Sequence, residues 1–190
     1  MARILAISSQ VIYGPVGLNC IVPALQSQGH EVLALPTILL SNHPGHGKPE
    51  GHATTASEMA AMLAALQNLG AFKNLDAIIT GYFASAEQVD IIASLIAELD
   101  CPIILVDPVL GDHGKLYISE ETALAIGKKL LPLSTIITPN AFELSCLSGL
   151  TVNNAEEAVS AARKLHVAEV ISTSIATGIT NLSTCPILID

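Results

Sequence analysis

The chain has 190 residues, of which 51% are hydrophobic and 13% are charged, and its 17 acidic and 8 basic side chains give a net charge of −9. This length suits one domain with a substantial core, and the acidic balance disfavours non-specific nucleic-acid binding. No apolar run reaches the roughly 18 residues of a membrane span, and Met1–Ile7 is too short for a signal peptide. The four cysteines form no Cys-x-x-Cys pair, which disfavours zinc or a disulfide framework and fits a reducing cytoplasm.

Short apolar runs alternate with amphipathic stretches along the whole chain. The predicted strands are Ile4–Ser8, Glu31–Leu35, Ala77–Thr80, Ile103–Val106, Thr135–Ile137, Glu169–Ser172 and Ile187–Ile189. Most are continuously apolar, which is typical of strands covered on both faces. Helix starts are predicted from three capping patterns, Thr55–Glu58, Ser85–Gln88 and Asn154 with Glu157. Strands separated by helices predict one α/β domain over residues 1–190, with a mostly parallel sheet and helices on both faces.

Residues 41–52 interrupt this alternation because they are rich in glycine, proline and histidine. We expect an irregular segment here, of the kind that is usually functional or mobile. His43, His46 and His52 lie in this segment rather than on a helix face. No fixed metal geometry follows, and contact with a polar ligand is the favoured interpretation.

Two predicted strands are followed by polar side chains. Asp107 and Asp112 come after Ile103–Val106, and Asn140 and Glu143 come after Thr135–Ile137. In an open α/β sheet, ligands bind at the carboxyl ends of the strands, so these oxygens suit a hard cation and its phosphates. A simpler alternative stays open, in which Asn140 caps a helix and Glu143 is the reciprocal capping residue.

The segment Asp112–Lys115 is interpreted as a flexible flap or, alternatively, as an exposed turn. It is not a Walker A loop, since the spacing is short and no serine or threonine follows the lysine. No Gly-x-Gly-x-x-Gly fingerprint follows the first strand. Cys20 and Cys146 lie in apolar helical surroundings, and we expect both to be core thiols.

Several segments together resemble pyridoxal kinases of the ribokinase-like superfamily. They are Ile7–Gly17, Leu40–His43, Thr80–Tyr82, Asp107–Asp112 and Thr138–Glu143, and they occur in family order across the chain. Hydroxymethylpyrimidine kinases usually carry a GSDxSGGAG-like start, which this chain lacks.

The resemblance implies transfer of the γ-phosphate of ATP to the 5′-hydroxyl of pyridoxal, pyridoxine or pyridoxamine. It places the substrate ring against Ser9, Val16, His43 and Tyr82. It assigns Mg²⁺ to Asp107, Asn140 and Glu143, and it leaves a monovalent cation such as K⁺ open. It assigns ATP to Asp107, Asp112, Tyr117, Thr138, Thr173 and Ser174, with Asp112–Tyr117 as the flap. It further implies a homodimer. Pro44 stands where many relatives have threonine, which removes one polar contact.

The resemblance also implies a Gly-x-Gly-Asp motif, whose amides form an anion hole and whose aspartate is the catalytic base. No such motif occurs in these 190 residues, so the catalytic residue is unknown and we expect the natural protein to continue past Asp190. Two alternatives stay open: a truncated, non-catalytic relative that binds a B6 vitamer, and a kinase of another small alcohol such as hydroxymethylpyrimidine.

Overall fold

A central mixed sheet organises the molecule. The computed structural model describes residues 1–175 and 185–189. The strands are β1 (Arg3–Tyr13), β2 (Glu31–Asn42), β3 (Gly51–Ala53), β4 (Ala77–Thr80), β5 (Ile103–Val106), β6 (Gly111–Asp112), β7 (Lys115–Leu116), β8 (Ile136–Ile137), β9 (Glu169–Ile175) and β10 (Cys185–Ile189). Eight of them form one sheet in the order β10-β9-β8-β5-β4-β1-β2-β3, and β6 pairs with β7 in a separate hairpin. Within the eight-stranded sheet the two outermost pairs, β2 with β3 and β9 with β10, are antiparallel, and the other neighbouring pairs are parallel.

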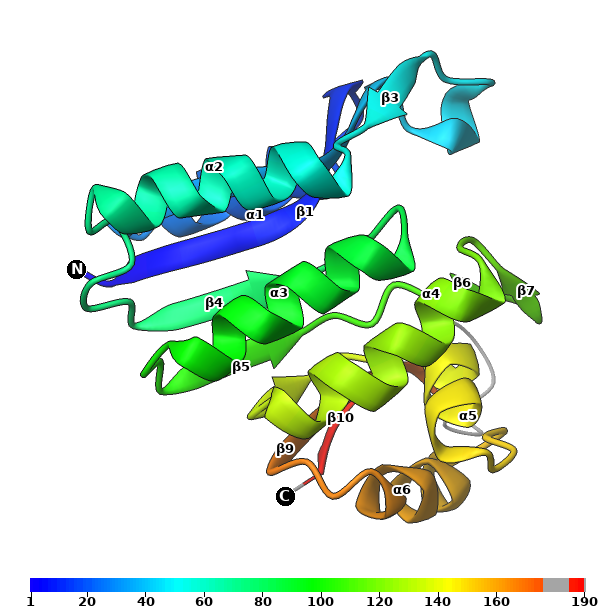
Figure 1. Ribbon diagram of the computed structural model, residues 1–190. Coiled ribbons are helices and arrows are strands. Elements are labelled where there is room, and N and C mark those ends of the chain that lie inside the picture. Colours follow the sequence, from blue (N-terminus) through cyan, green and yellow to red (C-terminus); the bar gives the residue numbers. More distant parts are fainter. Residues whose placement is uncertain (176–184, 190) are drawn as a thin grey trace.

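Helices flank this sheet. They are α1 (Leu18–Ser27), α2 (Ala56–Asn68), α3 (Ala86–Glu98), α4 (Glu120–Ala125), α5 (Ala141–Ser148) and α6 (Ala155–Lys164). A π turn (Ile126–Leu130) and a 3-10 turn (Leu131–Leu133) continue α4. In Figure 1, α2, α3 and α4 lie side by side across the near face, while α1 packs against β1 and β2. This arrangement confirms the predicted mostly parallel α/β fold.

The first two strands are longer than the sequence suggested. β1 runs on to Tyr13 and β2 to Asn42, because their parallel pairing continues past an irregularity at Ser8 and Ser9. β2 then turns through a 3-10 segment (Pro44–His46) into β3, which the sequence analysis did not predict. Figure 1 shows this β2–β3 arm projecting beyond the rest of the sheet.

The core lies between the sheet and the helices. Inward-facing strand residues such as Leu5, Ile7 and Ile78 have no exposed surface. Helices contribute fully buried side chains, including Met59, Val89, Ile92, Leu130, Leu144, Ala158 and Ala161. Each fully buried large aliphatic side chain contributes about 1.5–3 kcal/mol, so this core holds the strand ends in fixed relative positions.

Cys20 and Cys146 are exposed, so the expectation that both are core thiols was wrong. Leu18 is the one buried residue of α1, and in α5 the buried positions are Glu143, Leu144 and Ser148. The buried face of each short helix is therefore narrow, and the cysteines fall outside it.

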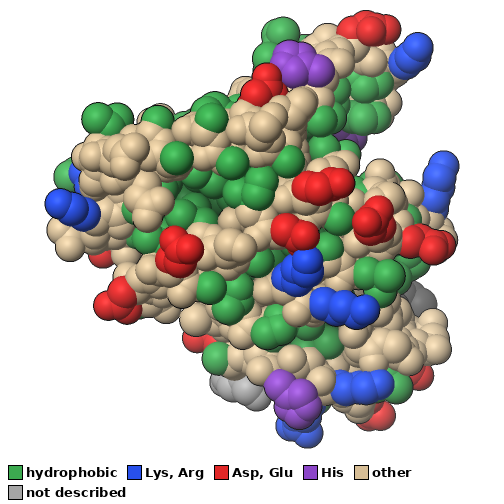
Figure 2. Space-filling model, viewed as in Figure 1, with side chains coloured by type: hydrophobic (Ala, Val, Ile, Leu, Met, Phe, Trp, Pro, Cys, Tyr) green, Lys and Arg blue, Asp and Glu red, His purple; other side chains and the backbone are tan. Residues whose placement is uncertain are grey.

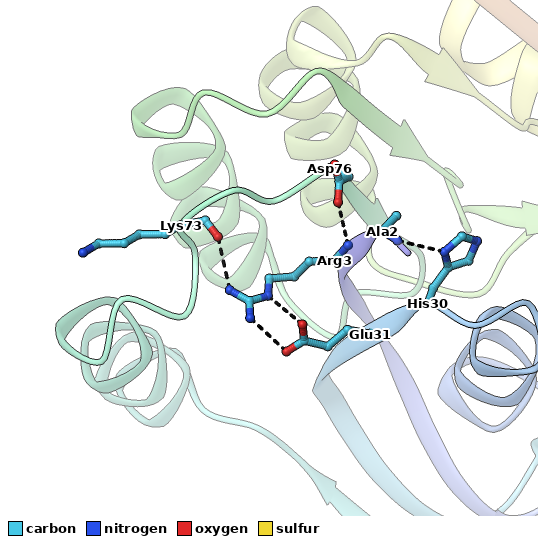
Figure 3. A network of polar contacts seen from close by, with 6 residues as sticks. All are labelled: Ala2, Arg3, His30, Glu31, Lys73 and Asp76. Carbon is cyan, nitrogen blue, oxygen red and sulfur yellow. Dashed lines mark hydrogen bonds and ion pairs between the residues drawn. The ribbon is translucent and has the colours of Figure 1, made fainter.

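The amino end of the sheet is held by exposed polar contacts (Figure 3). Arg3 forms a two-pronged pair with Glu31, at 2.9 and 3.2 Å. Its guanidinium also donates to the Lys73 carbonyl, and its backbone N–H donates to Asp76 at 2.7 Å. These contacts join the starts of β1 and β2 to the turn before β4.

On the face drawn in Figure 2, lysine and arginine side chains are dispersed among acidic and hydrophobic ones rather than gathered in one patch. Among the described residues, no helix combines the length and apolar character that a membrane crossing requires.

Candidate functional site at the carboxyl edge of the sheet

Polar side chains collect where β5 and β8 end. Val106 and Ile137 are paired in register, so the residues that follow them, Asp107 and Thr138, are neighbours. The Thr138 hydroxyl donates to Asp107 Oδ1 at 3.1 Å. The resemblance assigned both residues to ATP, and the parallel pairing of the two strands brings them together.

Asn140 and Glu143 form the capping box at the start of α5. Asn140 Oδ1 accepts from the Glu143 N–H, and Glu143 Oε2 accepts from the Asn140 N–H, both at 2.9 Å. The same side chains also reach the chain before β6: Glu143 Oε1 accepts from the Leu110 and Gly111 N–H groups at 3.0 and 3.4 Å, and Asn140 Nδ2 donates to the Gly111 carbonyl at 2.9 Å. The pair thus caps a helix and anchors the β6–β7 hairpin.

The two carboxylates of this edge are held in an unfavourable electrostatic environment. Burial raises the pKa of Asp107, with the Thr138 hydrogen bond acting against it. Burial, opposed by backbone hydrogen bonds and reinforced by the charge of Asp107, raises the pKa of Glu143 from 4.5 to about 7. Within residues 1–175 and 185–189, neither carboxylate forms an ion pair. A bound cation would relieve both effects.

The donor set at this edge fits Mg²⁺ better than a metal held by protein ligands alone. In the described part of the chain, no group of three or more His, Cys, Asp or Glu side chains could enclose a metal. Magnesium is usually bound by one or two carboxylates together with water and substrate phosphates. Asp107, together with Asn140 and Glu143, offers such a set of oxygen ligands, which water and substrate phosphates would complete.

The predicted flap forms a hairpin beside these residues. Asp112 Oδ1 accepts from the His113 N–H at 2.7 Å, and His113 and Gly114 make the turn with φ of 49° and 77°. Tyr117 is 60% exposed, and its N–H donates to the Leu110 carbonyl at 2.8 Å. Both residues of this turn have positive φ, and Tyr117 lies just beyond the hairpin that they close.

Thr173 and Ser174 lie at the end of β9, next to α5. Thr173 pairs with Asn140 as an isolated bridge, and its N–H donates to the Pro139 carbonyl at 2.9 Å. Ser174 is exposed and has φ of 58°, a left-handed conformation that is uncommon for serine. The residues that the resemblance assigned to ATP and metal therefore share one edge of the sheet.

The residues assigned to the substrate ring are only partly brought together. Ser9 and Val16 are close because Gly17, at φ 57°, approaches Ser9 so tightly that a Cβ there would overlap its backbone and hydroxyl oxygens. The Tyr82 backbone contacts the residue before Ser9, since its N–H donates to the Ser8 hydroxyl at 3.3 Å. Burial raises the pKa of the Tyr82 phenol. His43 is exposed on the β2–β3 arm, and its N–H donates to the Tyr13 carbonyl at 3.0 Å, near the segment that carries Val16.

A separate hollow of about 740 Å³ lies between α1 and the outer parts of β1 and β2. Its lining includes Ile12, Tyr13, Asn19 and His46 but none of the four residues assigned to the substrate ring. The carboxylates Asp107 and Glu143 lie outside this hollow, in the segments that follow β5 and β8. We place the candidate site at these carboxylates, because carboxylate oxygens are the ligands that a hard cation and its phosphates require.

Sequence reasoning missed two buried polar residues near Tyr82. Thr37 has no exposed surface and donates from its hydroxyl to the Tyr82 carbonyl at 2.7 Å. Gln88, which is 1% exposed, contacts the chain on both sides of the arm. The pattern Ser85–Gln88 predicted that Gln88 takes part in a helix cap, but it did not predict the contacts of Gln88 with Thr37 and Thr54.

Comparison with known proteins identifies the family of this chain. The family profile described as phosphomethylpyrimidine kinase matches residues 49–184. A pyridoxine/pyridoxal/pyridoxamine kinase of Bordetella avium is 40% identical over 168 residues, covering 85% of this chain and 56% of the relative. The chain thus spans little more than half the length of that relative.

Solved structures of pyridoxal kinases share the fold. The enzyme of Entamoeba histolytica has a TM-score of 0.89 and 31% identity, covering 94% of this chain and 66% of that one. The enzyme of Leishmania donovani in complex with ADP and pyridoxamine has a TM-score of 0.88 and 31% identity, covering 93% and 63%. The chain therefore belongs to the phosphomethylpyrimidine kinase family, and the relatives that it resembles are pyridoxal kinases with the ribokinase-like fold.

Proposed function

We propose that this protein serves the ATP-dependent phosphorylation of the 5′-hydroxyl of pyridoxal and related B6 vitamers. The observation that carries the proposal is the pair of carboxylates at the carboxyl edge of the sheet, half-buried Asp107 and buried Glu143, whose pKa values are both raised. Phosphoryl transfer depends mainly on positioning and on neutralising phosphate charge. The complex of the Leishmania donovani relative with ADP and pyridoxamine supports the choice of substrates.

Asp107 would hold Mg²⁺, and Asn140 and Glu143 would act on it and the phosphates partly through water. Bound there, Mg²⁺ would neutralise the phosphate oxygens of ATP. Thr138 orients Asp107 through its hydroxyl. The hairpin residues Asp112 and Tyr117 would cover the nucleotide, and Thr173 and Ser174 would line its groove.

Ser9, Val16 and Tyr82 would bind the vitamer ring, with His43 approaching from the arm. Ser9 would hydrogen-bond the pyridine ring, while Val16 and Tyr82 would pack against it. No residue of this chain is assigned as the catalytic base, because the sequence contains no Gly-x-Gly-Asp motif.

The protein is proposed to be a cytoplasmic homodimer. Exposed apolar side chains beside the α1 hollow, Ile12 at 78% and Tyr13 at 65%, suit a self-association surface. Cys20, Cys101 and Cys146 are free thiols, as a reducing compartment would leave them. Sedimentation analysis tests the dimer, and replacing K⁺ by Na⁺ in the assay tests the monovalent cation.

The decisive experiment measures phosphate transfer from ATP to pyridoxal, pyridoxine, pyridoxamine and hydroxymethylpyrimidine, each with and without Mg²⁺. In the protein as its gene encodes it, we expect turnover of the three B6 vitamers that requires Mg²⁺. Binding of pyridoxal without turnover would instead support a non-catalytic vitamer-binding protein. Preference for hydroxymethylpyrimidine would overturn the assignment of the substrate.

A further inference from the structure

Gln88 does not complete the helix cap that its sequence position suggests. The Ser85 hydroxyl accepts from the Gln88 N–H at 3.4 Å, as a cap should. The side-chain oxygen of Gln88, Oε1, however, accepts from the backbone N–H of Ala84 at 2.9 Å. Its amide nitrogen donates to the carbonyls of Thr37 at 2.9 Å and Thr54 at 2.6 Å. One buried amide therefore joins β2, the strand-to-helix turn after β3, and the loop before α3.

Thr37 is placed by an irregularity in β2. The register of β1 and β2 passes from Ser8 opposite Pro36 to Ser9 opposite Ile38, which leaves Thr37 as an extra residue. A bulge of this kind re-aims a side chain and commonly occurs next to active sites. Here it turns the Thr37 hydroxyl inward to the Tyr82 carbonyl, at 2.7 Å.

The backbone of Tyr82 is thus held on both sides. Its N–H donates to the Ser8 hydroxyl at 3.3 Å, and its carbonyl accepts from the Thr37 hydroxyl. Gly81 allows this approach, because a Cβ there would lie 2.6 Å from the Ser8 hydroxyl oxygen. The result is a fixed spacing between Tyr82 and the part of β1 that carries Ser9.

The same contacts reach the arm. Thr54 follows β3, and it is tied to β2 twice, through its N–H to the Thr37 carbonyl at 3.0 Å and through its hydroxyl to the Pro36 carbonyl at 2.7 Å. Gln88 adds the third tie at the Thr54 carbonyl. The base of the arm that carries His43 is therefore joined to the Tyr82 loop by one buried network.

We propose that Thr37 and Gln88 are positioning residues that set the width of the acceptor-ring pocket, by fixing Tyr82 relative to Ser9 and to the arm that carries His43. This inference rests on the proposed function. A core that needed only packing would be served by apolar side chains at both positions, whereas here each polar atom has a partner that fixes the geometry.

The test compares steady-state kinetics of the wild type with Thr37→Val, which keeps the shape and removes the donor. The KM for pyridoxal should rise about tenfold, since a carbonyl loses its partner, while the KM for ATP stays within about twofold. Thr37→Ser restores the hydroxyl and should return the KM for pyridoxal to the wild-type value. If the wild type binds pyridoxal without turnover, dissociation constants replace KM values in the same comparison.

The matched control is Thr135→Val at the opposite end of the sheet. The Thr135 hydroxyl accepts from the Ile104 N–H at 2.9 Å and donates to the Ile104 carbonyl at 3.2 Å. This variant loses comparable hydrogen bonds and should leave both KM values unchanged. An equal rise in the KM for pyridoxal in Thr135→Val would mean general loosening and would overturn the proposal.

Gln88→Met provides a second variant if Thr37→Val does not fold. It should raise the KM for pyridoxal selectively and speed amide exchange at Ala84, whose N–H loses its acceptor. If the wild type phosphorylates pyridoxal and both variants have the wild-type KM for pyridoxal, this inference alone is overturned. A wild-type protein that neither binds nor phosphorylates pyridoxal would overturn the proposed function, and the inference with it.

Discussion

The chain contains the pattern Asn-Ala-x-Glu twice, at residues 140–143 and 154–157, and the two copies occupy different environments. In both, the asparagine oxygen caps a helix by accepting from the glutamate N–H, at 2.9 and 3.0 Å. Glu143 is 5% exposed and accepts from three backbone N–H groups on two segments. Glu157 instead accepts locally, from the backbone and side chain of Asn153.

The difference comes from where each helix begins. α5 follows β8, so its first turn lies at the carboxyl edge of the sheet, beside Asp107 and the start of the β6–β7 hairpin. α6 follows a surface turn, and Asn154 is exposed. The same four-residue pattern therefore specifies a helix start in both places, but only the sheet topology gives one copy a buried carboxylate next to another.

Asp107→Asn should have the largest effect, because it removes the charge that distinguishes the first environment from the second. We expect phosphorylation of pyridoxal to fall by about 10²-fold or more, as for loss of a group that stabilises transferring phosphate. Stability should not fall, since burial already raises the pKa of Asp107. Glu157→Gln is the matched control and should retain wild-type turnover. Equal losses in the two variants would remove the functional distinction between the two sites.

The pH dependence of folding should distinguish the two glutamates next. Burial raises the pKa of Glu143 from 4.5 to about 7, so between these values the folded state holds a proton that the unfolded state has released. The free energy of unfolding must then fall as pH rises through this window, by about 3 kcal/mol. Urea denaturation of the ligand-free protein at several pH values measures this slope.

Glu143→Gln should reduce that slope, leaving the part due to Asp107, whose pKa is raised in the same direction. The slope should persist in Glu157→Gln, because Glu143 is still present. Saturating Mg²⁺ with nucleotide should also flatten it, since a bound cation stabilises the ionised form. A wild-type slope of the opposite sign would show that Glu143 is ionised and well compensated in the folded protein.

The sequence predicted the regular parts of the molecule because they depend on short-range patterns. Continuous apolar runs identified the parallel strands, and Thr55 with Glu58 forms the predicted capping box. The meeting of Asp107 with Thr138 was also predictable, because parallel strands place their carboxyl ends together.

Long-range features were not predictable in this way. The bulge that turns Thr37 toward Tyr82 depends on the register between β1 and β2, which no local pattern encodes. Gln88 was expected to cap its own helix, yet its amide bonds to residues 34 and 51 positions away. Similarly, the sequence could not show that Glu143 contacts residues 110 and 111, since this requires the fold to bring α5 against the hairpin.

The smallest effect should come from removing each asparagine cap. Asn140→Ala and Asn154→Ala should each lower the free energy of unfolding by about 1 kcal/mol, because both lose the same helix cap. Only Asn140 also donates to the Gly111 carbonyl, at 2.9 Å, so amide exchange in the β6–β7 hairpin should rise in Asn140→Ala alone. Exchange mass spectrometry on both variants separates the two contributions. If the hairpin exchanges equally in both, Asn140 is only a helix cap, and the hairpin is held by Glu143 without its help.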